Sequence, residues 1–115
     1  MTRPLHIAIA ESDDLIRQLV QLWLHDAGHT SDALDAGPVP ARRFDLVIAN
    51  VSSPRSAAAE VRALRAAHGA PLLLLSARFG RTTPQTLAQQ LGVAATLAKP
   101  FTRQELMAAI DRALP

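Results

Sequence analysis

The sequence has no cysteine, which excludes disulfide bonds, thiolate metal sites and thiol chemistry. It also lacks an apolar run long enough to cross a bilayer, and no signal peptide precedes its first apolar segment. These absences predict a soluble, cytoplasmic protein that has no membrane partner.

The sequence also has little excess of one charge over the other. The formal net charge is only +2, and the pI of about 10.4 arises because nearly all cations are arginines, which do not titrate below very high pH. The only run of consecutive basic residues is Arg42-Arg43, which argues against a nucleic-acid-binding stripe. Nucleic-acid binding stays a minor alternative, to be revealed by steep salt dependence, if four arginines cluster: Arg62, Arg65, Arg78 and Arg81.

No internal repeat or low-complexity linker divides the chain. Its 115 residues, of which 49% are hydrophobic, are enough for one core, so residues 1–115 are expected to form a single domain.

Short apolar segments alternate with helical patterns along this domain. The predicted strands are 6–10, 30–34, 45–51, 72–75 (ending at Ser76) and 94–98. The predicted helices follow Ser12 or Asp13, occupy about one turn near 41–44, and cover 56–67, 83–91 and a last segment after Thr102. This alternation predicts an α/β fold with a doubly wound parallel sheet.

Local signals mark the helix ends. Ser12 or Asp13 can cap the first helix and Gly28 can end it, Ser56 can cap the next long helix, and Thr83-Pro84 reads as N-cap and first turn. The segment from Thr102 to Glu105 is a capping box. Two sets of residues should face inward: Ile16, Leu19, Val20, Trp23, Leu24 and Ala27 in the first helix, and Leu106, Ile110, Ala113 and Leu114 in the last.

Polar side chains stand where the predicted strands end. They are Glu11, Asn50, Ser76 and Lys99, the only lysine of the chain. Because functional sites of such sheets lie at the carboxyl ends of the strands, these residues should converge. The segment Glu11-Ser12-Asp13-Asp14 is an acidic cluster. Such a cluster, a polar strand end and a Lys-Pro are typical of a phosphoryl-accepting pocket, here with an amide in place of the nucleophile.

The segments Ile7–Arg17, Phe44–Pro54, Leu72–Ala77 and Gly92–Phe101 together resemble the receiver domains of two-component response regulators. The resemblance covers nearly the whole chain and implies a flavodoxin-like, five-stranded sheet in the order 2-1-3-4-5, here with a shortened second helix. It also implies a cis peptide bond between Lys99 and Pro100.

Carried over residue by residue, the resemblance puts Asn50 at the phosphoacceptor position. A neutral amide has no anionic oxygen with which to attack phosphorus. Ser76 and Lys99 keep the supporting hydroxyl and cation, and Thr96 replaces the aromatic residue of the output switch.

The same resemblance places a metal site at Glu11, Ser12 and the backbone carbonyl of Ser52. Neutral Ser12 and Asn50 remove two of its three negative charges, so Mg²⁺ should bind weakly or not at all and no cofactor is expected. Asp13 is a possible substitute ligand, although a role as a helix N-terminal charge is favoured.

Together these changes predict a degenerate, pseudo-receiver type: a phosphorylation-independent protein-interaction module in signal transduction, and not an enzyme. Its partner would be a histidine kinase, a phosphotransfer protein of a phosphorelay, or an effector. Leu15 and Leu22, one heptad apart on the flank of the first helix, either widen the core stripe or dock that partner. The alternative function is a non-covalent sensor of an anion or small ligand in the residual pocket of Lys99 and Ser76.

The four histidines show no metal-ligand spacing, so surface or capping roles are expected for His6, His25, His29 and His68. A hydrolase built on Ser76 is disfavoured because the topology puts no histidine beside it.

Overall fold

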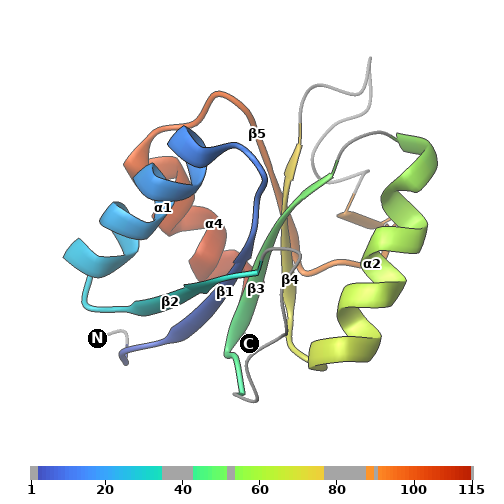
Figure 1. Ribbon diagram of the computed structural model, residues 1–115, viewed down its shortest axis with the longest axis horizontal. Coiled ribbons are helices and arrows are strands. Elements are labelled where there is room, and N and C mark those ends of the chain that lie inside the picture. Colours follow the sequence, from blue (N-terminus) through green and yellow to red (C-terminus); the bar gives the residue numbers. More distant parts are fainter. Residues whose placement is uncertain (1–2, 35–42, 52–53, 77–87, 90, 115) are drawn as a thin grey trace.

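The computed structural model describes residues 3–34, 43–51, 54–76, 88–89 and 91–114. Its centre is a five-stranded sheet in the order β2-β1-β3-β4-β5, with every neighbouring pair parallel. Helices α1 and α4 cover one face of the sheet and α2 covers the other (Figure 1). The predicted α/β fold and strand order are therefore confirmed.

The strands lie close to their predicted positions. They are β1 (His6–Ala10), β2 (Thr30–Ala33), β3 (Leu46–Val51), β4 (Leu72–Ser76) and β5 (Ala95–Ala98). The three helices with described bounds are α1 (Asp14–Asp26), α2 (Pro54–His68) and α4 (Arg103–Ala113). The predictions of β3 and β4 succeed because each strand begins with four consecutive apolar residues, as expected of strands that are covered on both faces.

Asp13 is the residue that caps α1, since its side-chain oxygen accepts a hydrogen bond from the amide of Ile16 at 3.0 Å. At the other end, the amide of Gly28 donates to the carbonyl of His25 and the amide of His29 donates to that of Leu24. This Schellman pattern needs a left-handed residue, and Gly28 has a φ of 89°.

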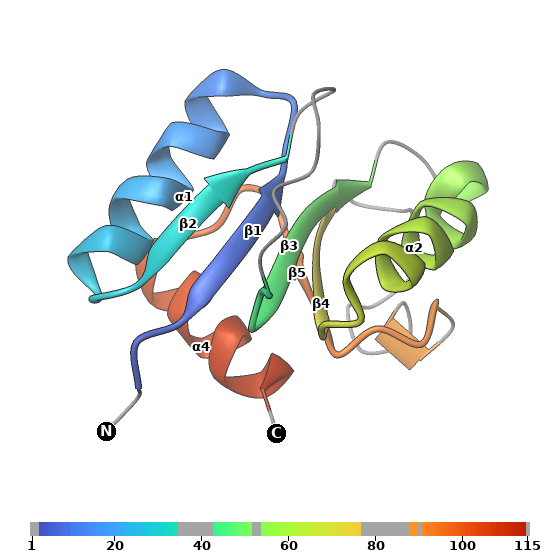
Figure 2. The same cartoon turned by 60° about the horizontal axis from the view of Figure 1, so that its bottom comes forward.

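The inward stripe of α1 is narrower than predicted. Val20 and Leu24 are buried, while Ile16 and Trp23 are partly buried against the core. Leu19 is 40% exposed and Ala27 is also exposed, so their assignment to the core is wrong. The reason is that α1 lies on one face of the sheet, so that only one side of the helix packs against the strands (Figure 2).

Two other helix predictions need correction. The second long helix starts at Pro54, where proline suits a first turn, so Ser56 lies inside α2 and is not its N-cap. Arg43 and Phe44 are not helical, which contradicts a helical turn reaching residue 44. Residues 41–42 of that turn, and Thr83 and Pro84, lie outside the described residues; 88, 89 and 91 are helical as predicted.

The last helix is as predicted. Thr102 and Glu105 form a capping box, in which the Thr102 hydroxyl accepts from the Glu105 amide and the Glu105 carboxylate accepts from the Thr102 amide. Leu106, Ile110 and Ala113 are buried. Leu114 is partly buried against the same core.

Side chains on the two faces of the sheet make two separate cores. The larger lies under α1 and α4 and contains Ile7, Ile9, Ile48, Leu73 and Leu106, among others. The smaller lies under α2 and contains Ala8, Val47, Leu74, Ala57 and Val61, among others. Each buried Leu or Ile stabilises the fold by roughly 1.5–3 kcal/mol, which fixes the strand ends that carry the polar residues.

One histidine departs from its expected surface role. His29 is only 6% exposed, and its Nδ1 accepts a hydrogen bond from the amide of Leu5 at 3.0 Å. The bond joins the loop after α1 to the start of β1 and satisfies a backbone donor that would otherwise be buried. His29 is therefore a structural residue of the interior.

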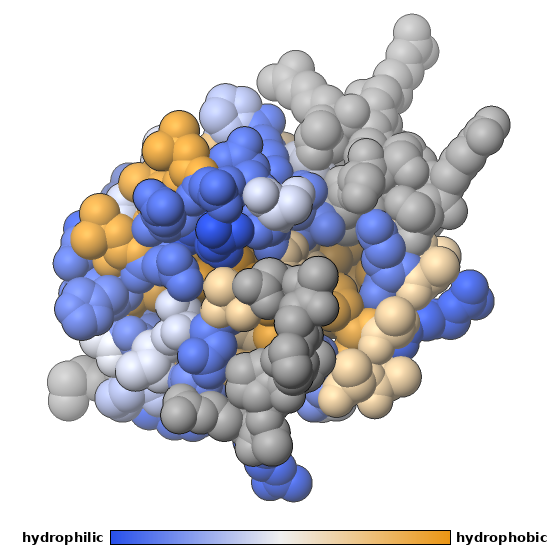
Figure 3. Space-filling view, viewed as in Figure 1, coloured by the Kyte–Doolittle hydropathy of each residue, from blue (hydrophilic) through white to orange (hydrophobic). Residues whose placement is uncertain are grey.

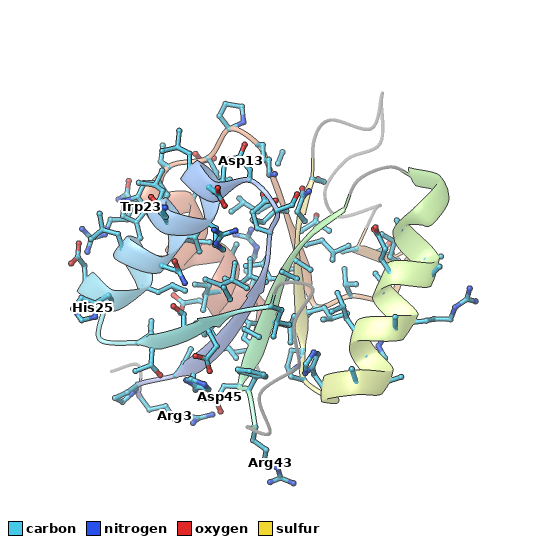
Figure 4. All side chains as sticks on the ribbon, in the orientation of Figure 1. Arg3, Asp13, Trp23, His25, Arg43 and Asp45 are labelled. Carbon is cyan, nitrogen blue, oxygen red and sulfur yellow. The ribbon has the colours of Figure 1, made fainter. Side chains whose placement is uncertain are left out.

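At the start of the sheet, Asp45 joins two chain segments (Figure 4). Its carboxylate accepts from the amide of His6 at 2.9 Å and from the Arg3 guanidinium at 3.1 Å. The hydrogen bond from the His6 backbone is the main cause that holds the pKa of Asp45 below its ordinary 3.8, with Arg3 adding to it against the effect of burial.

Because folding lowers the pKa of Asp45, its ionised form stabilises the native state above the unfolded pKa, and this contribution disappears as pH falls through the folded pKa. We predict that Asp45→Asn lowers the free energy of unfolding at about pH 7, and that the difference from wild type shrinks as the pH falls below 3.8 and through the lowered pKa of the folded state. Urea unfolding over a series of pH values from neutral to acidic measures it. Asp111→Asn on exposed α4 controls for net charge, and a difference for Asp45→Asn that is constant with pH would contradict the prediction.

Candidate functional site

The sheet brings three of the predicted residues together at the carboxyl ends of its strands. Glu11 follows β1, Asn50 lies near the end of β3, and Lys99 follows β5. The Lys99 ammonium donates to Glu11 Oε1 at 2.5 Å and to Asn50 Oδ1 at 2.9 Å. Both hydrogen bonds can form at once, since an ammonium has three donors.

This cluster is largely removed from solvent. The side chain of Glu11 is 1% exposed and that of Lys99 is 20% exposed. A carboxylate buried to this degree needs a compensating cation, because burial of an unpaired charge is costly. The ammonium of Lys99 supplies that cation within the described residues.

Glu11 is held from its other side as well. Its Oε2 lies 3.4 Å from the amide of Asp13, and its backbone carbonyl accepts from the Arg17 guanidinium at 3.2 Å. Arg17 also binds the carboxylate of Asp14 at 2.5 Å. Arg17 was not among the predicted site residues, although its position three residues after Asp14 is a helical ion-pair spacing that indicates this contact.

Ser76 and Thr96 are both buried on the neighbouring strands. Ser76 ends β4 at 5% exposure, and its backbone carbonyl accepts the amide of Lys99 at 2.9 Å. Thr96, the predicted switch position, lies within β5 at 4% exposure. Ser76 thus reaches the cluster through the backbone of Lys99.

Most of the predicted metal ligands that the structure describes are exposed or already hydrogen-bonded. Ser12 is exposed and the Asp13 carboxylate caps α1. Oε1 of Glu11 and Oδ1 of Asn50 accept from Lys99. Ser52 lies outside the described residues, and among the described residues no group of three His, Asp or Glu side chains could hold a metal. A Mg²⁺ ion would have to displace the ammonium and find further hard oxygens.

The segment after Lys99 matches the expectation from the resemblance. The Lys99-Pro100 peptide bond is cis. The next residue, Phe101, packs its ring edge-on against Trp23 of α1, with 6.2 Å between ring centroids. Trp23 thus has the packing role that its place in the core stripe suggested.

Leu15 and Leu22, the predicted docking residues, are 74% and 54% exposed. Leu19 lies between them at 40% exposure, so the exposed leucines follow a four-three spacing along α1. Figure 3 shows hydrophobic atoms over α1 that stand among hydrophilic ones. We call Leu15, Leu19 and Leu22 the leucine strip.

The arginines proposed as a nucleic-acid patch are only partly described. Arg62 and Arg65 are exposed on α2, and the Arg65 guanidinium donates to the carbonyl of Gly92. Arg78 and Arg81 lie outside the described residues. Among the described helices, none is long and apolar enough to span a membrane.

No protein-family model and no curated protein matches the sequence. Solved structures do match. The chemotaxis response regulator CheY4 of Vibrio cholerae is 25% identical with a TM-score of 0.78, over 97% of this chain and 100% of that one. A response regulator receiver protein from Burkholderia phymatum is 23% identical with a TM-score of 0.70, over 98% and 99% of the two chains.

Some matching structures belong to much longer chains. NtrX from Brucella abortus is 24% identical with a TM-score of 0.79, and the match covers 97% of this chain but 26% of that one. The described fold is thus that of response-regulator receiver domains, the class that the resemblance implied.

The contacts of Lys99 with Glu11 and Asn50 should contribute to the stability of the fold. Lys99→Met should lower the free energy of unfolding by about 3 kcal/mol, because it leaves the Glu11 carboxylate buried without its cation. Adding Glu11→Gln should recover much of that loss, since no charge then remains to be buried. Denaturant unfolding of the single and double variants measures both effects.

Arg62→Met, at an exposed position of α2, is the matched control for loss of a cation. A loss below about 1 kcal/mol in Lys99→Met would mean that the pair behaves as a surface ion pair and does not hold the site together.

Proposed function

We propose that this chain is a degenerate receiver domain that acts in two-component signal transduction as a phosphorylation-independent protein-interaction module. One observation carries the proposal: the ammonium of Lys99 is already bound by the carboxylate of Glu11 and the amide oxygen of Asn50. The receiver fold supports a signalling role, and this closed contact supports the loss of phosphoryl chemistry.

Asn50 stands near the carboxyl end of β3, where the receiver resemblance expects the phosphoacceptor. Formation of an acyl phosphate requires a carboxylate oxygen that attacks phosphorus while the metal and the lysine neutralise the phosphoryl oxygens. The Asn50 amide is a poor nucleophile, and its Oδ1 accepts a hydrogen bond from Lys99. Both features oppose phosphorylation.

We also propose that Mg²⁺ is not a cofactor of this domain. Glu11 provides a single buried carboxylate, and Lys99 neutralises it. With Ser12 exposed and uncharged, the remaining donors are too few and too weakly charged for an ion that dehydrates reluctantly.

The interaction surface that we propose is the leucine strip of α1. Exposed leucines in a row are unfavourable on a free surface, and a partner that covers Leu15, Leu19 and Leu22 would remove them from water. The partner would be a cytoplasmic signalling protein, either a histidine kinase, a phosphotransfer protein or an effector.

The alternative function, an anion or small-ligand sensor in the Lys99 and Ser76 pocket, has less support. An anion would compete with the buried Glu11 carboxylate for the same ammonium, and would leave that carboxylate unpaired. The interaction module avoids this conflict because it leaves the cluster intact.

Restoring the missing carboxylates should restore metal binding. We predict that Ser12→Asp combined with Asn50→Asp binds Mg²⁺ at least about tenfold more tightly than wild type, because two hard anionic ligands join Glu11. Isothermal titration calorimetry with MgCl₂ measures it.

The control for added charge is Gln18→Asp with Gln104→Asp, which places two carboxylates on exposed helix positions. Equal Mg²⁺ affinity of wild type and the restored variant would show that the two substitutions are not what disables the metal site.

The leucine strip has its own test. We predict that Leu15→Glu with Leu22→Glu abolishes capture of the protein's signalling partner from a lysate, since buried glutamates would oppose the apolar contact. Affinity capture with mass spectrometry compares this variant with Ala58→Glu and Ala59→Glu, which add the same charge to exposed α2. Equal loss in both variants, or no loss in either, would place the partner surface elsewhere.

A further inference from the structure

A second cluster of reactive side chains lies at the opposite end of the sheet from Lys99. His6 begins β1 and pairs in register with Thr30, which begins β2. The His6 Nδ1 lies 2.6 Å from the Thr30 hydroxyl, and its Nε2 lies 2.9 Å from the carboxylate of Asp32. A carboxylate, an imidazole and a hydroxyl therefore form a continuous hydrogen-bonded chain.

The direction of these hydrogen bonds follows from their chemistry. An ionised carboxylate can only accept, so the Nε2 of His6 carries a proton and donates to Asp32. In the neutral ring, Nδ1 then has a free lone pair and accepts from the Thr30 hydroxyl. The competing acceptor for that hydroxyl, the carbonyl of Leu5, is 3.4 Å away, beyond a normal O–H···O distance.

The imidazole is also fixed in place. Its ring stacks on Phe44 with centroids 5.1 Å apart and an interplanar angle of 13°. Phe44 in turn contacts the ring of His68 edge-on, at 5.5 Å. The backbone amide of His6 donates to the carboxylate of Asp45, which pairs with Arg3. A base held by packing and hydrogen bonds loses little orientational freedom when it reacts.

Reagents can reach this cluster. Thr30 is exposed, whereas the His6 side chain is 20% exposed and that of Asp32 is 31% exposed. Thr30 is thus the most accessible residue of the three, and the base and the carboxylate are partly shielded.

We propose that Thr30 is a nucleophilic threonine and a site of acylation, activated by His6 and oriented through Asp32. Thr30 Oγ1 forms a bond to the carbonyl carbon of a small activated ester or thioester, and its proton passes to Nδ1 of His6. The bond from that carbon to the leaving oxygen or sulfur breaks, and the leaving group takes its electron pair and the proton from His6. Asp32 stabilises the transient imidazolium.

The test treats the intact protein with p-nitrophenyl acetate and locates the acetyl group by peptide mass spectrometry. Thr102 is an internal control, because it is exposed and its hydroxyl binds a backbone amide instead of a histidine. General-base assistance should acetylate Thr30 at least about tenfold faster than Thr102. Equal rates at the two threonines would overturn the proposal.

Variants separate chemistry from structure. Thr30→Val should abolish acetylation of the peptide that contains position 30. Asp32→Asn should slow acetylation of Thr30 by about tenfold or more, because an amide cannot stabilise the imidazolium. His25→Gln, which removes an exposed histidine of α1, should change nothing.

If His6 and Asp32 only tie the edge strand β2 to β1, Asp32→Asn will lower the melting temperature and leave the rate at Thr30 unchanged. That result would overturn the proposal. Should Asp32→Asn fail to fold, the ratio of the acetylation rates of Thr30 and Thr102 in the wild-type protein still tests the proposal.

Discussion

The contact between Lys99 and Glu11 constrains the whole carboxyl-terminal edge of the sheet. Glu11 is buried to 1% exposure at the end of β1, and the cation that compensates it comes from the end of β5, 88 residues later in the chain. Removal of either charge alone would leave the other without its partner. Asn50 lies on β3, which stands between β1 and β5 in the sheet order, and accepts a second hydrogen bond from the ammonium.

A parallel sheet is what makes this contact possible. Helices return the chain so that all five strands point the same way, and the residues that follow them meet at one edge. In an active phosphoryl-accepting site, this edge would hold an excess of negative charge for a metal ion to neutralise. Here one carboxylate faces one ammonium, so the charge is balanced without a metal, and that balance underlies the proposal of a constitutive interaction module.

Much of this could be predicted from sequence, because the relevant signals are local or periodic. The continuous apolar runs at Ile7–Ile9 and Leu72–Leu75 define strands, and the Thr102–Glu105 capping box defines a helix start. Contacts between residues far apart in the sequence were harder to predict. Nothing near His29 reveals that it accepts from Leu5, and the exposure of Leu19 depends on how α1 rests on the sheet. The cluster of His6, Thr30 and Asp32 also appears only once β1 and β2 are placed in register.

We propose that the pocket around Asn50 does not respond to a phosphoryl group. This proposal is best tested by an amide-NMR titration with Mg²⁺ and beryllium fluoride, which mimics that group. We expect that the resonances of Asn50, Ser76 and Lys99 do not move at saturating concentrations. Shifts at these residues that extend into α4 would contradict it, because the pocket would then still bind the mimic and transmit a conformational change.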